Sequence, residues 1–336
     1  MPAFGFIDAS IPDLLRLLAV PILGWASWRD IETRRVPNQT WYPLAILAVV
    51  LLFWEGWLAV IGTAFQTRAF GIRTAVSLGF VAPLVIAFWW FRAFGGADAK
   101  AFLVVAALFP TFPVYELPTL GLKLPHQTTT LGVFSLTILT NTVLLGALFP
   151  LAILLRNVVA GRFSKMMAIG KPVRWDEIPR AHGKLLESED GLSGNGVDLD
   201  AVRMYLRWRG LTLGDLREQT DHFRDPATLP ANPNSPGDGA VTRADGGEHK
   251  RTNYVPAIDV PENDPWGAEK FLNDIQGSAY GTTPERLRGG LEVLTREERV
   301  WVSPGIPFIV PLFFGLVVSL TYGDLLFGLL GLLGLV

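Results

Sequence analysis

The sequence has no cysteine among its 336 residues and only four histidines. The absence of cysteine excludes disulfides, thiol catalysis and cysteine-based metal sites. The histidines are scattered along the chain without the spacing of metal ligands. P-loop, G-x-S-x-G and H-E-x-x-H motifs are also missing, which argues against an ATPase, a serine hydrolase and a zinc protease. We therefore expect no cofactor and no metal site.

The sequence also lacks a large excess of either charge. Its formal net charge is −2, and it has no basic stripe or nucleic-acid-binding motif, so we expect no nucleic acid among its partners. The charges are unevenly placed, because residues 157–302 hold 23 of the 31 acidic and 19 of the 29 basic residues. The net charge therefore averages a charged middle segment and two apolar flanks.

Long hydrophobic runs are abundant. Half of the residues are apolar, and they concentrate in the runs 12–28, 41–61, 74–93, 99–115, 131–155 and 303–322. Each run has about 17–25 residues, the length at which a helix crosses the hydrocarbon core of a bilayer. The first run lacks the basic leader of a cleavable signal peptide, since Asp8 precedes it and Asp13 lies at its start. The sequence predicts an all-α polytopic membrane protein, a six-helix transmembrane bundle surrounded by membrane lipid.

The runs and the charges divide the chain into three predicted parts. These are a membrane domain with spans one to five, 1–156, an insertion, 157–302, and a sixth span with a C-terminal tail, 303–336. Within the insertion we expect helices over 200–210 and 284–302. Residues 224–255 are rich in Pro, Gly, Asp and Asn, so we expect the insertion to be partly disordered there.

The placement of lysine and arginine predicts the orientation in the cell membrane, because cytoplasmic loops carry an excess of these residues. The basic residues that follow the first and fifth runs are Arg29, Arg34, Arg35, Arg156, Arg162, Lys165, Lys171 and Arg174. Arg68 and Arg73, between the second and third runs, count against the same orientation. The balance favours an N-terminus outside the cell and a cytoplasmic 157–302 loop.

Two aspartates lie where an apolar run meets polar sequence. Asp30 follows the first run and Asp98 precedes the fourth, so with this orientation both lie at the cytoplasmic face. A carboxylate at the membrane edge is costly unless it is hydrated, paired or functional. Two carboxylates that share one proton can activate water and protonate a peptide group. The pair therefore predicts a membrane aspartic protease with Asp30 and Asp98 as its catalytic residues.

Each aspartate taken alone also has a structural interpretation. Asp30 can pair with Arg34 at i+4, and an acid such as Asp98 in the first turn of a helix complements the helix dipole. Glu32 could rival Asp30 as the first acid of the pair. Glu55 and Asp324, in or beside other apolar runs, are more typical of structural roles.

Short motifs surround the two aspartates. Besides the aspartates themselves, they consist of Arg35, Pro37, Asn38, Gly95, Gly96, Ala97 and Lys100. These motifs resemble the signature sites of the type IV prepilin peptidases, and most closely those of archaeal preflagellin and prepilin peptidases, members of the G-x-G-D class of membrane aspartic proteases. The stretch from Pro304 to Asp324 is also similar to the last span of that family. Ala97 stands where the strict motif has glycine.

The resemblance implies an endopeptidase that removes short basic leader peptides from archaellin (preflagellin) and type IV pilin-like precursors with class III-type leaders. The cleavage would occur at the cytoplasmic face. Because the Cys-x-x-Cys pairs of bacterial enzymes that also methylate pilins are absent, we expect peptidase activity only. Two other classes stay open: a transporter or channel whose acids line a polar path, and an inactive scaffold that recruits partners through residues 157–302.

Overall fold

The computed structural model describes residues 3–4, 7–91, 94–188, 191–192, 196–241, 263–275, 279–305 and 307–334. Residue contacts divide the chain into two units. Unit 1 comprises residues 1–149 and 306–336, and unit 2 comprises residues 150–305. Each unit has a hydrophobic core of its own, so each is described separately.

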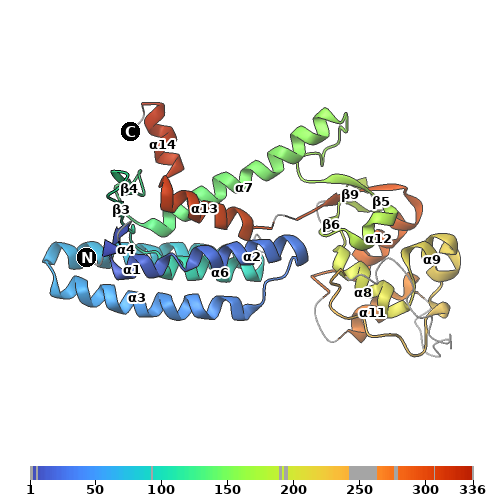
Figure 1. Ribbon diagram of the computed structural model, residues 1–336. Coiled ribbons are helices and arrows are strands. Elements are labelled where there is room, and N and C mark those ends of the chain that lie inside the picture. The colour runs from blue at the N-terminus through green and yellow to red at the C-terminus, as the bar shows by residue number, and fades with distance from the viewer. Residues whose placement is uncertain are drawn as a thin grey trace. The chain divides into compact units, whose positions relative to one another are not determined.

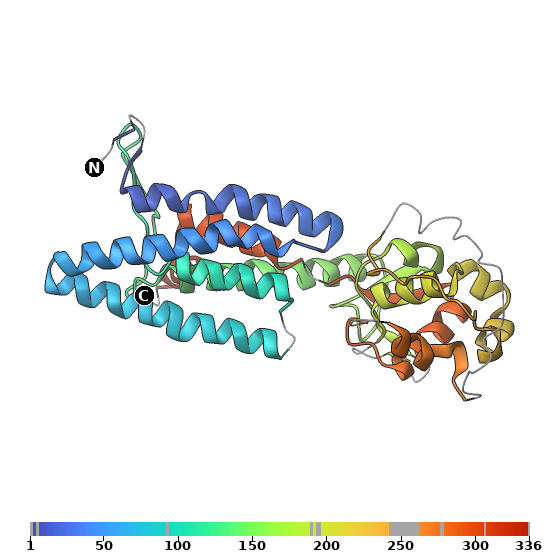
Figure 2. The same ribbon diagram turned by 90° about the horizontal axis from the view of Figure 1, so that it is seen from below.

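Unit 1 is a helix bundle with a small sheet at one end. Its helices are α1 (Ile11–Arg16), α2 (Ala19–Thr33), η1 (Asn38–Trp41), α3 (Tyr42–Ile61), α4 (Ala64–Val76), η2 (Ser77–Val81), α5 (Ala82–Trp90), α6 (Gly96–Leu108), the first part of α7 (Phe134–Val159), α13 (Ile309–Thr321) and α14 (Leu325–Leu332). Helices α2, α3 and α6 run alongside one another, and α13 packs against α2 and α6 (Figures 1 and 2). Strands β1 (Ala3–Phe4), β2 (Ile7–Ala9), β3 (Tyr115–Leu117) and β4 (Leu122–Leu124) form an antiparallel sheet in that order.

Four helical stretches are long and apolar enough to cross a membrane. They are Ile11–Thr33, Asn38–Ile61, Ala64–Trp90 and Phe134–Val159, which overlap the predicted first, second, third and fifth spans. Large apolar side chains on these stretches face outward, with Phe53, Trp57 and Trp90 among the most exposed. A contiguous apolar exterior suits a lipid environment rather than water. The prediction of an all-α polytopic membrane protein is confirmed.

The helix lengths do not confirm the predicted count of six spans. The fourth run forms α6 and the sixth forms α13, and each helix has 13 residues. At 1.5 Å per residue such a helix is about 20 Å long, which is short of the roughly 30 Å hydrocarbon core. Proline explains why these two helices are shorter than the predicted runs, because Pro110 follows the end of α6 and Pro307 precedes the start of α13.

Unit 2 is a mixed α and β structure. Strands β5 (Lys171–Arg174), β9 (Arg299–Ser303) and β6 (Lys184–Leu185) form a sheet with β9 in the centre, and β7 (Glu187–Ser188) pairs with β8 (Gly191–Leu192). The helices are η3 (Trp175–Arg180), α8 (Leu199–Arg209), α9 (Leu213–Glu218), α10 (Thr220–Arg224), η4 (Pro226–Thr228), η6 (Pro265–Gly267), α11 (Ala268–Asp274) and α12 (Pro284–Arg296). Trp208, Trp266 and Phe271 are among its largest fully buried side chains. Residues 157–302 therefore contain a hydrophobic core of their own.

The helix predicted over 200–210 is present as α8, which ends at Gly210 in the left-handed region with φ 69°. The helix predicted over 284–302 is wrong at its end. Helix α12 stops at Arg296, and β9 follows with alternating exposure because its side chains point to opposite faces of the sheet.

Of the segment 224–255, residues 224–241 are described and include a hydrogen bond from Asn234 N to Trp208 O of 3.0 Å. Residues 242–255 lie outside the described residues.

Candidate active site

Asp30 lies in the last turn of α2, against the start of α13. Its side chain is 7% exposed, and the backbone N–H of Ile309 donates a hydrogen bond to it. Ser27, one turn earlier, donates from Oγ to the carbonyl oxygen of Ile309 at 3.0 Å. Asp30 Oδ2 has no hydrogen-bond partner among the described residues. A buried carboxylate oxygen without a partner is energetically costly, which is typical of a group held for function.

Asp98 lies in the first turn of α6, where it also caps the helix. The backbone N–H of Gly95 donates to Asp98 Oδ2 at 3.0 Å. The side chain is half-buried. This hydrogen bond sets the direction of the carboxyl group, because it joins the carboxylate to the backbone of the turn that precedes the helix.

The structure brings the two aspartates together. Asp98 interacts electrostatically with Asp30 and with Arg34, and Arg34 interacts with both carboxylates. Arg34 caps α2 in the left-handed conformation, with φ 55°, and its N–H donates to Asp30 O at 3.0 Å. One guanidinium therefore accompanies a pair of carboxylates that come from two helices.

Sequence reasoning treated Arg34 only as a structural partner of Asp30 and did not foresee that it also interacts with Asp98. The i+4 spacing from Asp30 was the available signal, but spacing within one helix says nothing about a second helix. The position of Ile309 beside Asp30 was likewise missed. Ile309 accepts a hydrogen bond from Ser27, which is 282 residues away in the sequence. No local pattern could therefore reveal that Ile309 lies at this end of α2.

The other motif residues lie around this pair. Lys100 Nζ donates to Asn38 Oδ1 at 2.7 Å, which joins the second motif to the first. Pro37 caps η1, and the backbone N–H of Arg35 donates a hydrogen bond to Thr33 Oγ1 at 3.3 Å. Ala97 is packed against the core of unit 1. The two sequence motifs thus form one local structure at one end of the bundle.

Aromatic rings hold the glycine turn against α13. The ring of Phe94 lies 5.4 Å from that of Phe102 on α6 and 4.7 Å from that of Phe308, centroid to centroid. Phe308 immediately precedes Ile309, the residue that contacts Asp30. Aromatic pairs at these separations stabilise packing beyond the area they bury. The cluster therefore positions Gly95 and the start of α13 relative to each other.

The fold and this site define a polytopic membrane protein with paired carboxylates at one end of a helix bundle. A model of the type IV leader peptidase family matches residues 17–153, which include both aspartates, and one described as Archaeal Peptidase A24 C-terminus Type II matches residues 243–325. Over these residues the chain is similar to the type IV leader peptidase family.

A curated relative points the same way. The chain is 27% identical over 148 residues to a preflagellin peptidase of Methanococcus voltae, and the match covers 43% of this chain. It spans 58% of the length of that relative.

Proposed function

We propose that this protein is a membrane aspartic endopeptidase that removes short basic leader peptides from preflagellin and type IV pilin-like precursors. The observation that carries the proposal is the electrostatic interaction between Asp30 and Asp98, two acids from separate motifs and separate helices. Similarity to the type IV leader peptidase family over residues 17–153 supports the same reaction. The cleavage face and residues 157–302 are assigned to the cytoplasmic side by the distribution of basic residues.

The proposed chemistry uses the two carboxyl groups as one unit. Like charges in proximity disfavour double ionisation, so one group carries a proton while the other is ionised. The ionised carboxylate takes a proton from water as the water oxygen bonds to the peptide carbonyl carbon. The protonated carboxyl gives its proton to the amide nitrogen, and the carbon–nitrogen bond breaks. The acid and base roles belong to the pair, because coupled groups titrate together.

The surroundings suit a substrate with a basic leader and an apolar helix. The exposed apolar side chains of the bundle can pack an apolar substrate helix. The leader, being polar, remains at the membrane edge where Asp30 and Asp98 lie. Cleavage between the two segments then falls at the carboxylate pair.

A transporter or channel is less consistent with the described residues. Several polar side chains buried inside the bundle form hydrogen bonds to neighbouring helices. Ser77 Oγ lies 2.6 Å from Ser135 Oγ, and Asn141 Nδ2 donates to Ser319 Oγ at 2.8 Å. These contacts join helices to one another. We therefore favour hydrolysis over conduction.

The proposed function predicts cleavage by the purified protein alone. A synthetic precursor with a basic leader and an apolar helix should be cut between the two segments in detergent, with no ion gradient present. Mass spectrometry of the products gives the position of the cut. A matched precursor with glutamine in place of the leader lysines should be cut more slowly. An intact precursor after prolonged incubation with folded protein would falsify the peptidase proposal.

The glycine turn gives a second, more local test. A Cβ added at Gly95 would lie 2.9 Å from Asp98 Oδ2, whereas one added at Gly96 has Trp89 Nε1 at 4.0 Å as its nearest neighbour. We expect Gly95→Ala to displace the carboxyl group and to slow cleavage on the order of 10–100-fold, since small misplacements of reacting groups are costly. Gly96→Ala, one residue away, is the matched control and should stay within about threefold of the wild-type rate. Equal rates for the two variants would contradict the positioning of Asp98 by this turn.

A further inference from the structure

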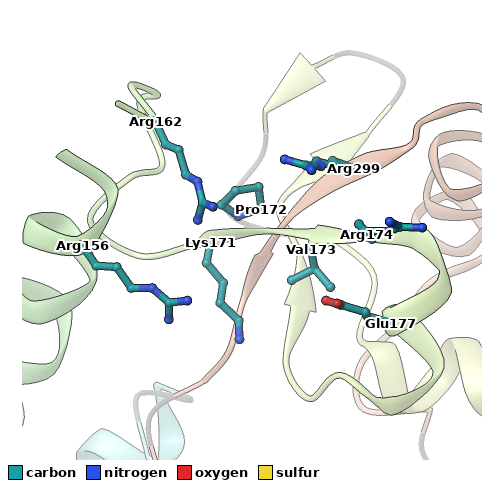
Figure 3. Close-up of a pocket in the computed structure, with 8 residues that line it drawn as sticks. All are labelled: Arg156, Arg162, Lys171, Pro172, Val173, Arg174, Glu177 and Arg299. Carbon is teal, nitrogen blue, oxygen red and sulfur yellow. The ribbon is translucent and has the colours of Figure 1, made fainter. Parts of the chain in front are cut away.

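Five basic side chains surround one cavity in unit 2. The cavity has a volume of about 250 Å³, and the charged residues lining it are Arg156, Arg162, Lys171, Arg174, Arg299 and Glu177. Figure 3 shows Arg156 and Arg162 reaching from the end of α7 and the loop after it towards Lys171 on β5. Glu177 lies beyond Val173 from these two arginines in the same view. The cavity is therefore strongly cationic.

The described residues leave most of this positive charge without an acidic partner. Arg156, Arg162, Lys171 and Arg299 form no ion pair with any acidic residue in the part of the chain that the structure describes, and Arg174 pairs with Asp176 at 3.0 Å. Arg174 is also directly opposite Arg299 in the β5–β9 register. Like charges directly opposite on paired strands are destabilising. A bound anion would offset that repulsion.

The backbone that carries two of the cations is held in place by hydrogen bonds. Asn157, which is 1% exposed, donates from Nδ2 to Met167 O and Gly170 O, both at 2.8 Å. The N–H of Arg162 donates to Asn157 O at 2.8 Å. These bonds fold the loop back onto the end of α7 and bring it to β5. A ligand would meet chain segments that are already in position, which reduces the entropic cost of binding.

Apolar side chains beside the cavity indicate a bilayer surface. The candidate span Phe134–Val159 ends three residues after Arg156. Val159 is 88% exposed, Phe163 is 74% exposed and Ile169 is 46% exposed. Exposed apolar residues interleaved with cations at the end of a span are typical of the headgroup region, where acidic lipids attract basic segments. A small anion dissolved in water would not interact favourably with these apolar side chains.

We propose that this cavity binds the phosphate headgroup of an acidic membrane phospholipid. The guanidinium groups would donate hydrogen bonds to phosphate oxygens, and Lys171 would add a point charge. The volume is roughly eight times the 30 Å³ that a water molecule takes in the liquid, which accommodates a phosphodiester with a small headgroup. The exposed apolar side chains would lie along the acyl chains. This proposal is independent of the proposed peptidase activity.

The test is a binding measurement on the full-length protein in uncharged detergent. Short-chain phosphatidylglycerol, short-chain phosphatidylcholine and inorganic phosphate are titrated separately by calorimetry. We expect phosphatidylglycerol to bind more tightly than either of the others. Lys171→Gln should weaken it roughly fivefold, which corresponds to about 1 kcal/mol for one basic residue near a lipid surface. Lys171→Arg should keep the affinity.

Lys165→Gln is the matched control. Lys165 is exposed and lies three residues from Arg162 but does not line the cavity, so its loss should leave the affinity within about twofold. Equal weakening by Lys165→Gln and Lys171→Gln would overturn the proposal in favour of non-specific charge attraction. Binding of inorganic phosphate as tightly as phosphatidylglycerol would assign the cavity to a free anion instead. Equal affinity for phosphatidylglycerol and phosphatidylcholine would also overturn the proposal.

Discussion

Asp30→Asn and Asp98→Asn should each slow precursor cleavage by about 10²–10⁴-fold, the usual contribution of a positioned acid or base. Asparagine keeps the size and the acceptor oxygen that contacts Ile309 or Gly95 but cannot exchange a proton. The fold should therefore survive while the reaction fails. The rate is measured on the synthetic precursor with enzyme in excess, so that substrate affinity does not obscure the chemical step.

Glu32→Gln is the matched control for the Asp30 variant. Glu32 is an acid two residues away in the same helix, and it is exposed. Its replacement removes the same charge and should leave the rate within about threefold of wild type, since exposed charges contribute little. Each variant should show the same thermal unfolding as the wild type. Retention of more than about a tenth of the wild-type rate by either aspartate variant would end the aspartic mechanism.

Arg16→Met should destabilise the protein by about 3–5 kcal/mol, the usual cost of removing one partner from a buried ionic network. Arg16 is 1% exposed. Its guanidinium donates to Asp13 at 2.8 Å, to Glu55, and through Nε to Leu108 O at 2.8 Å. The network joins α1, α3 and the end of α6. Without Arg16, two acids would face each other without a cation.

The measurement is the free energy of unfolding of the full-length protein in detergent, from denaturant titration. Lys123→Met is the matched control, because Lys123 pairs with Glu116 at 3.3 Å with both side chains at least half exposed. That pair should contribute less than about 1 kcal/mol. A similar loss of stability in the two variants would mean that the buried network around Arg16 has no special role.

The site was partly predictable because its signal is local. Asp30 followed by Pro37 and Asn38, and the glycines before Asp98, are short patterns in contiguous sequence. Successive spans cross a membrane in opposite directions. The end of the first predicted span and the start of the fourth therefore lie at the same face, which was enough to predict both acids at one end of the bundle. The hydrogen bond between Lys100 and Asn38 could not be predicted, because it depends on how α6 packs beside η1.

The fold was predictable where hydrophobic length decides it, and not where pairing over long distance does. Four spans follow from runs long enough to cross a bilayer. The sheet of unit 2 pairs residues 171–174 with residues 299–302. Over such a separation, alternation in β9 alone does not identify the partner strand, and residues 299–302 were assigned to a helix.

The sequence by itself determined that the chain is a helical membrane protein, that its chemistry does not use cysteine, and that Asp30 and Asp98 are the acids to test. Composition, run length and short motifs carry that information, because each is a property of neighbouring residues. Tertiary structure alone decided that Arg34 interacts with both carboxylates and that α13 begins beside Asp30. It also decided that cations from α7, β5 and β9 surround one cavity. Such contacts join distant segments, and only the packing of the whole chain sets them.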